Sequence, residues 1–166
     1  MHRAKLANTF SSAGPQMVQL TTKPCSTNYD GTDDNIRLEF LNVHGENCKT
    51  DYLNTDDNDF WHGVEQDWGG DHLMSCYGHR FRPIKTLDFR FHSNTLNWNL
   101  HVDQLTLCEV TVQFGSPAIY NSQGELVTPE TPGYSKWQWK GTTTNTHYTG
   151  YYNSHSNWNT MTKIEG

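Results

Sequence analysis

Apolar residues recur at every second position in several short runs of this chain. Examples are IRLEF (residues 36–40) and VTVQF (residues 110–114), where aliphatic or phenylalanine side chains alternate with polar ones. Successive side chains of a β-strand point to opposite faces, so this period is typical of strands that bury one face. No run supports a helix longer than a turn or two. We therefore expect an all-β fold, an antiparallel β-sandwich.

The expected strands are short and are separated by turn residues. They cover residues 17–21, 36–41, 48–53, 84–91, 98–107 and 110–114, with a change of inward face around Asp103 and Gln104. Glycine, proline, asparagine and aspartate between the runs favour turns, including a hairpin turn at HGEN (residues 44–47). Residues 54–80 are expected to form a long loop, which in a compact domain is usually functional or pinned.

The length of 166 residues indicates one domain with appendages. Residues 1–15 are small and polar and end at Gly14-Pro15, which favours a flexible N-terminal arm. Residues 16–115 hold the alternating runs and are expected to form the β-sandwich. Residues 116–166 are rich in aromatic residues, threonine and asparagine. There we expect an extension of two or three further strands, packed on the sandwich or on a neighbouring molecule.

The charge balance argues against a nucleic-acid partner. Lysine and arginine total 12 against 18 aspartates and glutamates, which gives a net charge of −6. The basic residues form no cluster beyond HRFR (residues 79–82), whereas phosphate binding needs a basic face. No apolar stretch reaches the length that spans a bilayer.

The four cysteines indicate the kind of cellular compartment in which the protein folds. Cys25, Cys48, Cys76 and Cys108 include no C-x-x-C pair, which argues against a zinc site. We expect two disulfides formed in an oxidising compartment, and therefore a secreted protein. Three pairings are open, and we favour Cys48–Cys76 with Cys25–Cys108. Because the first residues contain no apolar signal segment, the secreted form is expected to have lost its signal peptide.

Acidic and amide residues gather in two of the expected loops. The candidate metal ligands are Asp30, Asp33, Asp34, Asn35, Asp56, Asp57 and Asp59. Calcium takes about six to eight oxygen ligands, from side chains such as these and from backbone carbonyls. If the two loops lie at the same end of the sandwich, repulsion between the carboxylates favours a bound cation, and calcium is the expected cofactor. The alternative is a pair of solvated turns, since Asp and Asn favour turns.

Aromatic residues form two candidate contact sets. Trp61 and Trp68 lie beside the second acidic loop, where tryptophan suits a lipid interface, whereas Phe60 is expected in the core. In the C-terminal segment the candidates for partner binding are Trp137, Trp139, Tyr151 and Trp158. Rigid rings in loops suit carbohydrate or protein surfaces. The same residue types also favour ordinary strands, or a strand that pairs with a neighbouring subunit.

Recognisable catalytic patterns are missing from the sequence. It contains neither G-x-S-x-G nor H-E-x-x-H. Histidines 62, 72 and 79 lie near aspartates in the sequence, but a chain with nine histidines has such neighbours by chance. We therefore expect a protein without enzymatic activity.

The order of motifs across residues 31–112 resembles the PLAT domain, the β-sandwich appended to lipoxygenases, animal lipases and polycystins. The matching pieces are Gly31-Thr32-Asp33-Asp34, the strand 36–40, Gly45-Glu46, Leu53, Asn58-Asp59-Phe60, Gly63, Leu73, the strand 84–91, and Trp98 ahead of residues 102–105. Four cysteines are not a general feature of that family. The aromatic C-terminal segment has no counterpart in it either.

This resemblance implies an eight-stranded sandwich of two four-stranded sheets, with no catalytic activity. It also implies calcium-aided attachment to lipid or docking to protein, and it maps the family's metal-binding loops onto Asp33, Asp34, Asp56, Asp57 and Asp59. We accordingly expect an extracellular binding module that engages a lipid surface or a protein partner through calcium-assisted loops. The alternatives are a self-assembling structural protein that uses the C-terminal aromatic segment, and a small lectin that binds carbohydrate.

Overall fold

The computed structural model describes residues 16–26, 35–53, 60, 63–67, 72–75, 81–83, 85–94, 102–148 and 154–166. No helix occurs in these ranges, and strands make up most of them, which confirms the all-β prediction. It follows that the described part of the chain contains no helix with the length and apolar character to cross a bilayer.

Thirteen strands follow one another along the described chain. They are β1 (Gln16–Pro24), β2 (Asn35–Asn42), β3 (Asn47–Thr50), β4 (Gln66–Asp67), β5 (His72–Ser75), β6 (Leu87–Asn94), β7 (Val102–Phe114), β8 (Ile119–Tyr120), β9 (Leu126–Thr128), β10 (Ser135–Tyr148), β11 (Ser154–His155), β12 (Asn159–Thr160) and β13 (Thr162–Glu165). The long loop expected over residues 54–80 is wrong in part, because it contains β4 and β5. The two runs expected over residues 98–114 contribute to a single long strand, β7.

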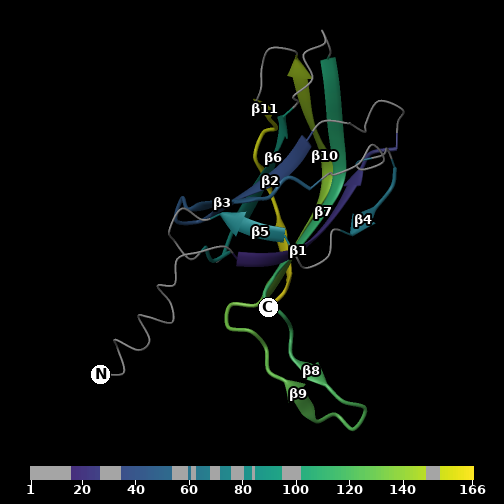
Figure 1. The fold of residues 1–166 in the computed structure, drawn as a ribbon. Coiled ribbons are helices and arrows are strands. Elements are labelled where there is room, and N and C mark those ends of the chain that lie inside the picture. Colours follow the sequence, from purple (N-terminus) through teal and green to yellow (C-terminus); the bar gives the residue numbers. More distant parts are fainter. Residues whose placement is uncertain are drawn as a thin grey trace.

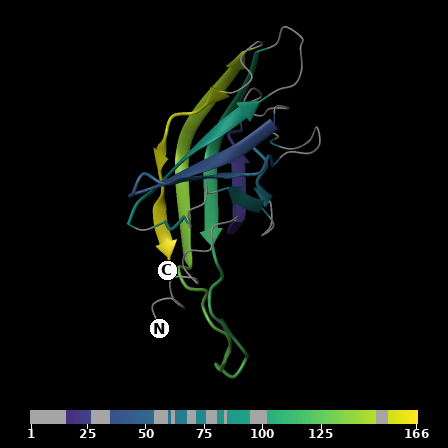
Figure 2. The same cartoon turned by 60° about the vertical axis from the view of Figure 1, so that its left-hand side comes forward.

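Eleven of the strands form one antiparallel sheet that folds over on itself. The order is β11-β6-β2-β3-β5-β1-β7-β10-β13, with β12 also on β6 and β4 also on β1. Figures 1 and 2 show β2 and β6 crossing β7 and β10 as a second layer. The antiparallel β-sandwich is thereby confirmed. Its layers are joined through β3, β5 and β1, and so differ from the two separate four-stranded sheets that the resemblance implies.

The core lies between these layers and is built by the predicted alternation. Ile36, Leu38 and Phe40 of β2 are fully buried, as are the inward residues of β6. From the opposite layer, the ring of Phe114 meets that of Phe40 edge-on, with centroids 5.8 Å apart. Edge-to-face aromatic pairs add to the stabilisation that comes from burying apolar area.

A β-bulge in β7 keeps both halves of this strand facing the core. Leu105 and Leu107, two residues apart, are both buried. Val110 is also buried, although it follows Leu107 by three residues, which in a regular strand would place it on the opposite face. The register with β1 shifts at this point, since Lys23 pairs with Glu109 but Pro24 pairs with Leu107. One extra residue on β7 therefore reverses the inward face. From the sequence, a change of inward face was expected at Asp103-Gln104, whereas the change at Cys108 was not expected.

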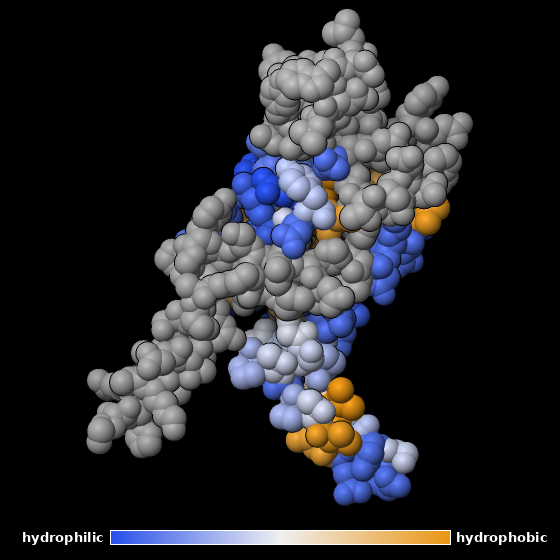
Figure 3. Space-filling view, in the orientation of Figure 1, coloured by the Kyte–Doolittle hydropathy of each residue, from blue (hydrophilic) through white to orange (hydrophobic). Residues whose placement is uncertain are grey.

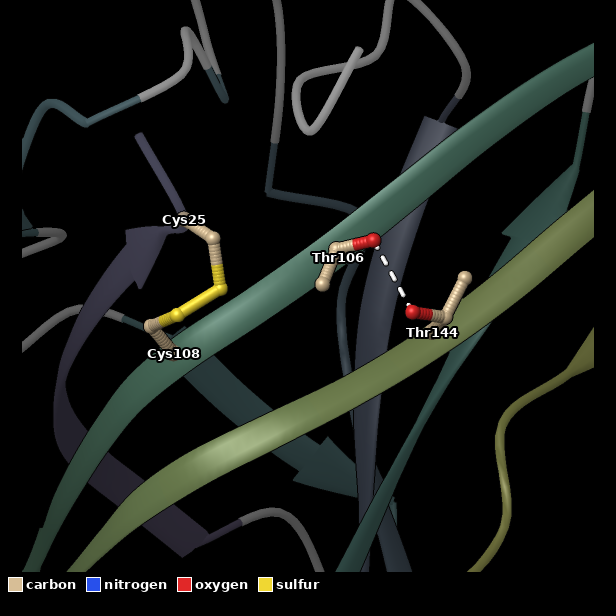
Figure 4. Close-up of a disulfide and its surroundings, with 4 residues drawn as sticks. All are labelled: Cys25, Thr106, Cys108 and Thr144. Atoms are coloured by element: carbon tan, nitrogen blue, oxygen red, sulfur yellow. Dashed lines mark hydrogen bonds between the residues drawn. A yellow bond between two sulfur atoms is a disulfide. The ribbon is translucent and has the colours of Figure 1, made fainter. Parts of the chain in front are cut away.

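The extra residue of the bulge is Cys108, which is disulfide-bonded to Cys25 just beyond β1. Figure 4 shows this bond beside the hydroxyl contact of 2.9 Å between Thr106 of β7 and Thr144 of β10. The predicted Cys25–Cys108 pair is thus confirmed. Cys48 is buried and also disulfide-bonded, and Cys76, the partner predicted for it, lies outside the described residues.

In the C-terminal segment, β10, β11, β12 and β13 are part of the sandwich. β10 lies between β7 and β13 within the main sheet. Residues 154–165, here called the C-terminal strap, pair first with β6 through β11 and β12 and then with β10 through β13. The strap thereby joins the two layers along one side of the molecule, where Figure 2 shows it as the yellow chain.

Candidate functional site

The predicted calcium ligands lie almost entirely outside the described residues. This applies to Asp30, Asp33, Asp34, Asp56, Asp57 and Asp59, while Asn35 is the first residue of β2. Among the residues that the structure does describe, no group of three or more His, Cys, Asp or Glu side chains is arranged to hold a metal ion.

The described residues that flank the two acidic stretches lie close together. The Leu53 amide donates to the Ile36 carbonyl at 2.8 Å, and the Gly63 amide donates to the Cys25 carbonyl at 2.9 Å. Cys25 and Ile36 also flank the other acidic stretch, which connects β1 to β2. The end of the first acidic stretch, at Ile36, therefore lies beside the start of the second, at Leu53. The start of the first, at Cys25, lies beside the end of the second, at Gly63.

The aromatic candidates occupy different environments. Phe60 is buried, as predicted for a core residue, whereas Trp61, Trp68 and Tyr151 lie outside the described residues. Trp137 was expected to contact a partner, but its side chain is only 1% exposed. Its indole Nε1 donates to the buried Ser135 hydroxyl at 2.9 Å. The prediction for Trp137 is therefore wrong, because this strand turns its apolar residues into the core.

Trp139 and Trp158 are partly buried against their own chain. Trp139 meets Phe89 edge-on, with ring centroids 5.0 Å apart. Trp158, in the C-terminal strap, lies under the guanidinium of Arg90, whose central carbon is 4.2 Å from the ring centroid. The described tryptophans of this segment therefore pack against other residues of the same chain.

A buried carboxylate organises the outer face of β2 and β6. Glu39 alternates with the core residues of β2, so its side chain points away from the core, yet only 1% of it is exposed. One carboxylate oxygen accepts from Arg90 Nε and from His92 Nε2, each at 2.7 Å. The other accepts from the Asn47 amide. Charge and hydrogen bonds thus compensate for the burial of this carboxylate.

These contacts set the protonation of the pair. Burial alone raises the pKa of Glu39, but hydrogen bonds from His92, Arg90 and Asn47 outweigh it and lower that pKa from 4.5 to about 2. Burial lowers the pKa of His92 below 6.5, and the Glu39 carboxylate offsets this only in part. At neutral pH the carboxylate is therefore ionised and the imidazole is neutral.

The β8–β9 hairpin projects from the sandwich, whereas strands packed on the sandwich or on a neighbouring molecule were expected in this segment. β8 and β9 form a separate two-stranded sheet that extends away from the sandwich (Figure 1). Ile119, Tyr120, Leu126 and Val127 are 51%, 62%, 56% and 61% exposed. Figure 3 shows apolar side chains gathered on this hairpin, with a hydrophilic tip beyond them. The available signal was the pair of short apolar runs, residues 118–120 and 126–127, on either side of a polar turn that contains Gly124.

Local hydrogen bonds shape the tip and the base of the hairpin. At the tip, the Asn121 side-chain oxygen accepts from the Gln123 and Glu125 amides at 3.0 and 2.9 Å. At the base, the Thr131 amide donates to the Ser116 carbonyl and the Thr131 hydroxyl accepts from the Ser116 amide. The exposed apolar side chains therefore sit on a defined scaffold between two closed turns.

An open hollow of about 310 Å³ lies on the outer face of β1, β7 and β10. It is lined by Gln19, Thr21, Glu65, Asp67, Thr111, Gln113, Lys136, Gln138 and Ile164. These amide and hydroxyl groups are those expected of a sheet face in water. Among the residues that the structure describes, no aromatic side chain lines this hollow.

Comparison with known proteins leaves the geometry as the basis for assigning function. No protein-family model matches this sequence, and no match is found among curated proteins.

Proposed function

We propose that this chain is a non-enzymatic extracellular binding module that engages a protein partner through the β8–β9 hairpin. The observation that carries the proposal is the exposure of four large apolar side chains on an isolated two-stranded sheet. Water-exposed apolar clusters of this kind mark interaction sites. A two-stranded hairpin is also marginally stable alone, so a partner that covers it stabilises it.

The chemistry of the hairpin favours a protein over a lipid surface. Its tip, residues 121–125, is polar and exposed, and the apolar side chains lie behind this tip. Insertion into a bilayer would carry Glu125 into the interface, which is costly. Residues 115–134 include Glu125 and Glu130 but no lysine or arginine. The matching partner surface is therefore apolar, with basic groups at its rim.

Site-specific cross-linking tests this proposal. A photoreactive residue is placed at Tyr120, or at the exposed Lys140 of β10 as a control, and the protein is exposed to extracellular fractions of its source. We expect a cross-linked partner from position 120 only. The isolated partner then binds the unmodified chain, and Leu126→Ser weakens the affinity at least about tenfold.

Two outcomes would contradict it. Equal cross-linking from positions 120 and 140 would mean that the hairpin is not the contact element. An unchanged affinity of the Leu126→Ser variant would mean that the apolar side chains do not contribute. Because Leu126 is exposed, the substitution is expected to leave the melting temperature within a few degrees of the original.

A second candidate function is calcium-assisted binding at the other end of the sandwich. Its support is the pair of shared anchors, Ile36 with Leu53 and Cys25 with Gly63. On this proposal, residues 30–34 and 56–59 supply carboxylates to one ion. Trp61 and Trp68 would then lie beside the ion and contact a lipid surface or a protein.

This end is well separated from the hairpin. Val18 pairs with Phe114 at the base of the hairpin, while Cys25 follows the far end of β1. Seven residues of strand span roughly 23 Å at about 3.3 Å per residue. The anchors of the two acidic stretches and the base of the hairpin therefore lie at opposite ends of β1, and the two functions are proposed independently of each other.

Calorimetry with calcium and then with a chelator tests the second function. Calcium is expected to raise the melting temperature, since a ligand of the folded state stabilises it by mass action. The double variant Asp33→Asn, Asp57→Asn is expected to lose that rise, while Asp88→Asn on β6 keeps it. Calcium-dependent binding to liposomes identifies a lipid surface. An equal rise in the double variant would exclude these loops.

The PLAT-like assignment of the sandwich is part of the same proposal. Its support is the order of motifs along residues 31–112, together with an antiparallel sandwich free of helices in the described residues. A binding module that supplies no catalytic residues is the role that this resemblance implies.

A further inference from the structure

We propose that the outer face of β2, β3 and β6 binds a saccharide that carries a sulfate or carboxylate group. This basic face consists of Arg37, Lys49 and Arg90 together with the rings of Tyr52 and Trp158. The proposal goes beyond the hairpin function and does not rest on it, because the face lies on the sandwich itself.

Strand register places the cationic side chains on one face. Glu39 pairs with Arg90 on β6 and with Lys49 on β3, and Arg37 lies two residues before Glu39. Directly paired residues in antiparallel strands, and residues two apart on one strand, share a face. Arg37 and Arg90 are therefore diagonal neighbours on adjacent strands.

The Arg90 guanidinium is held from two sides. Its Nε donates to the Glu39 carboxylate at 2.7 Å, and its central carbon lies over the Trp158 ring, 4.2 Å from the centroid. Its hydrogen bond to Glu39 uses Nε, and the side chain remains 22% exposed. A guanidinium fixed in this way loses little freedom when its remaining donors bind an oxyanion.

Arg37 is the residue that points most directly to a ligand. Its guanidinium lies 4.9 Å from the Tyr52 ring centroid. Its Nε is buried and has no hydrogen-bond partner. Buried donors in folded proteins are almost always satisfied, by protein, water or a bound group. Because Nε itself has no exposed surface, an oxyanion from outside the chain is expected on the terminal nitrogens of this guanidinium.

Charge and ring chemistry together define the ligand class. Three cations and two carboxylates, the buried Glu39 and Asp88, share this face, which therefore carries a net positive charge in a chain whose net charge is −6. Paired arginines recognise planar or tetrahedral oxyanions. A guanidinium covers one face of the Tyr52 ring and of the Trp158 ring, so a sugar ring is expected against the remaining surface of these rings. The Cys25–Cys108 disulfide fits an oxidising compartment, where sulfated and uronate-bearing glycans are the abundant polyanions.

Titration calorimetry of the full chain at low ionic strength tests the inference. The probes are a sulfated uronate-containing disaccharide, its unsulfated form, a neutral disaccharide and inorganic sulfate. We expect the sulfated disaccharide to bind best and the neutral one at least about tenfold more weakly. Arg37→Gln is expected to weaken the sulfated probe at least about tenfold. Lys140→Gln, on the opposite layer, is expected to leave it unchanged.

Three results would overturn it. The first is no binding of the sulfated disaccharide at millimolar concentration. The second is equal affinity in Arg37→Gln, whose folding is verified by its melting temperature. The third is inorganic sulfate binding as tightly as the disaccharide, which would leave an ion site without saccharide recognition. A fall in affinity of the original chain with added salt supports the proposal independently of any variant.

Discussion

Glu39 is buried although it occupies an outward position of its strand. At an outward position of a strand such as β2, a carboxylate is normally in contact with water. Here Arg90, His92 and Asn47 enclose it, and the C-terminal strap brings Trp158 over Arg90. The carboxylate therefore links β2, β3 and β6 by hydrogen bonds, and through Arg90 it also supports the strap.

At the residue scale we predict that Glu39→Gln destabilises the protein by about 2 kcal/mol at neutral pH. The folded-state pKa of Glu39, about 2, lies below its ordinary value of 4.5. Its stabilising contribution is therefore complete above pH 4.5 and is lost as the pH falls toward 2. Denaturant unfolding across this range is expected to show a smaller fall in stability for Glu39→Gln than for the original chain.

The matched control is Glu65→Gln, an exposed carboxylate on the other layer. It is expected to change the stability by less than about 0.5 kcal/mol at every pH. If Glu39→Gln behaved like Glu65→Gln, the carboxylate would contribute no more than a solvated one.

At the element scale, the same turn motif occurs twice in the chain. Asn42-Val43-His44-Gly45-Glu46 and Asn121-Ser122-Gln123-Gly124-Glu125 share the pattern N-x-x-G-E. In each, the Asn amide donates to the Glu carbonyl, and the Gly amide donates to the Asn carbonyl. Each Gly adopts a positive φ, 77° and 79°. Short-range chemistry therefore forms this turn both inside the sandwich and in the projecting hairpin.

The C-terminal strap is an element that depends on the rest of the fold. Its backbone pairs with β6, since the Met161 amide donates to the Leu87 carbonyl and the Ser156 amide donates to the Phe91 carbonyl. Met161 is buried among the core residues, whereas the other residues from Thr160 to Gly166 are exposed. One apolar side chain thus holds this end of the strap in place.

We predict that Met161→Ala destabilises the protein by about 2–3 kcal/mol, since burial is lost and a cavity remains. The amides of Ser156 and Met161 are expected to exchange with solvent faster than those of β7, as hydrogen exchange with NMR will show. Thr160→Ala, which alters an exposed neighbour, is the control and is expected to cost less than about 0.5 kcal/mol. Equal stability of the two variants would mean that Met161 does not anchor the strap.

At the scale of the whole molecule, the Cys25–Cys108 disulfide joins positions 83 residues apart. It ties the end of β1 to the bulge of β7 next to the anchor of the second acidic stretch, because the Gly63 amide binds the Cys25 carbonyl. A cross-link of this span removes many conformations from the unfolded chain. The bond therefore supports both the sandwich and the end at which the acidic stretches begin.

We predict that Cys25→Ser with Cys108→Ser lowers the free energy of unfolding by about 2–4 kcal/mol. The folded β-sandwich is expected to persist at low temperature, since its core residues are unchanged. Far-UV circular dichroism and denaturant unfolding measure the two effects. An unchanged unfolding midpoint would show that the cross-link does not stabilise the molecule.

Much of the fold follows from local pattern. The alternation in residues 36–40 places Ile36, Leu38 and Phe40 in the core, and the turn at residues 42–46 follows from its asparagine and glycine. The bulge at Cys108 is harder to predict, because the change of inward face shows only when β1 and β10 are paired with β7. The candidate sites were predicted less well, since Trp137 is buried and the hairpin was not recognised.

The sequence by itself determined that the described chain is built of strands, which side chains of β2 face inward, and where the N-x-x-G-E turn forms. These are consequences of side-chain period and turn chemistry, which act over a few residues. Only the tertiary structure decided that the C-terminal strap joins the layers, that Glu39 is buried on an outward face, and that the hairpin stays uncovered. Each depends on which distant segments share a surface, and that is set by the combined packing of strands far apart in the sequence.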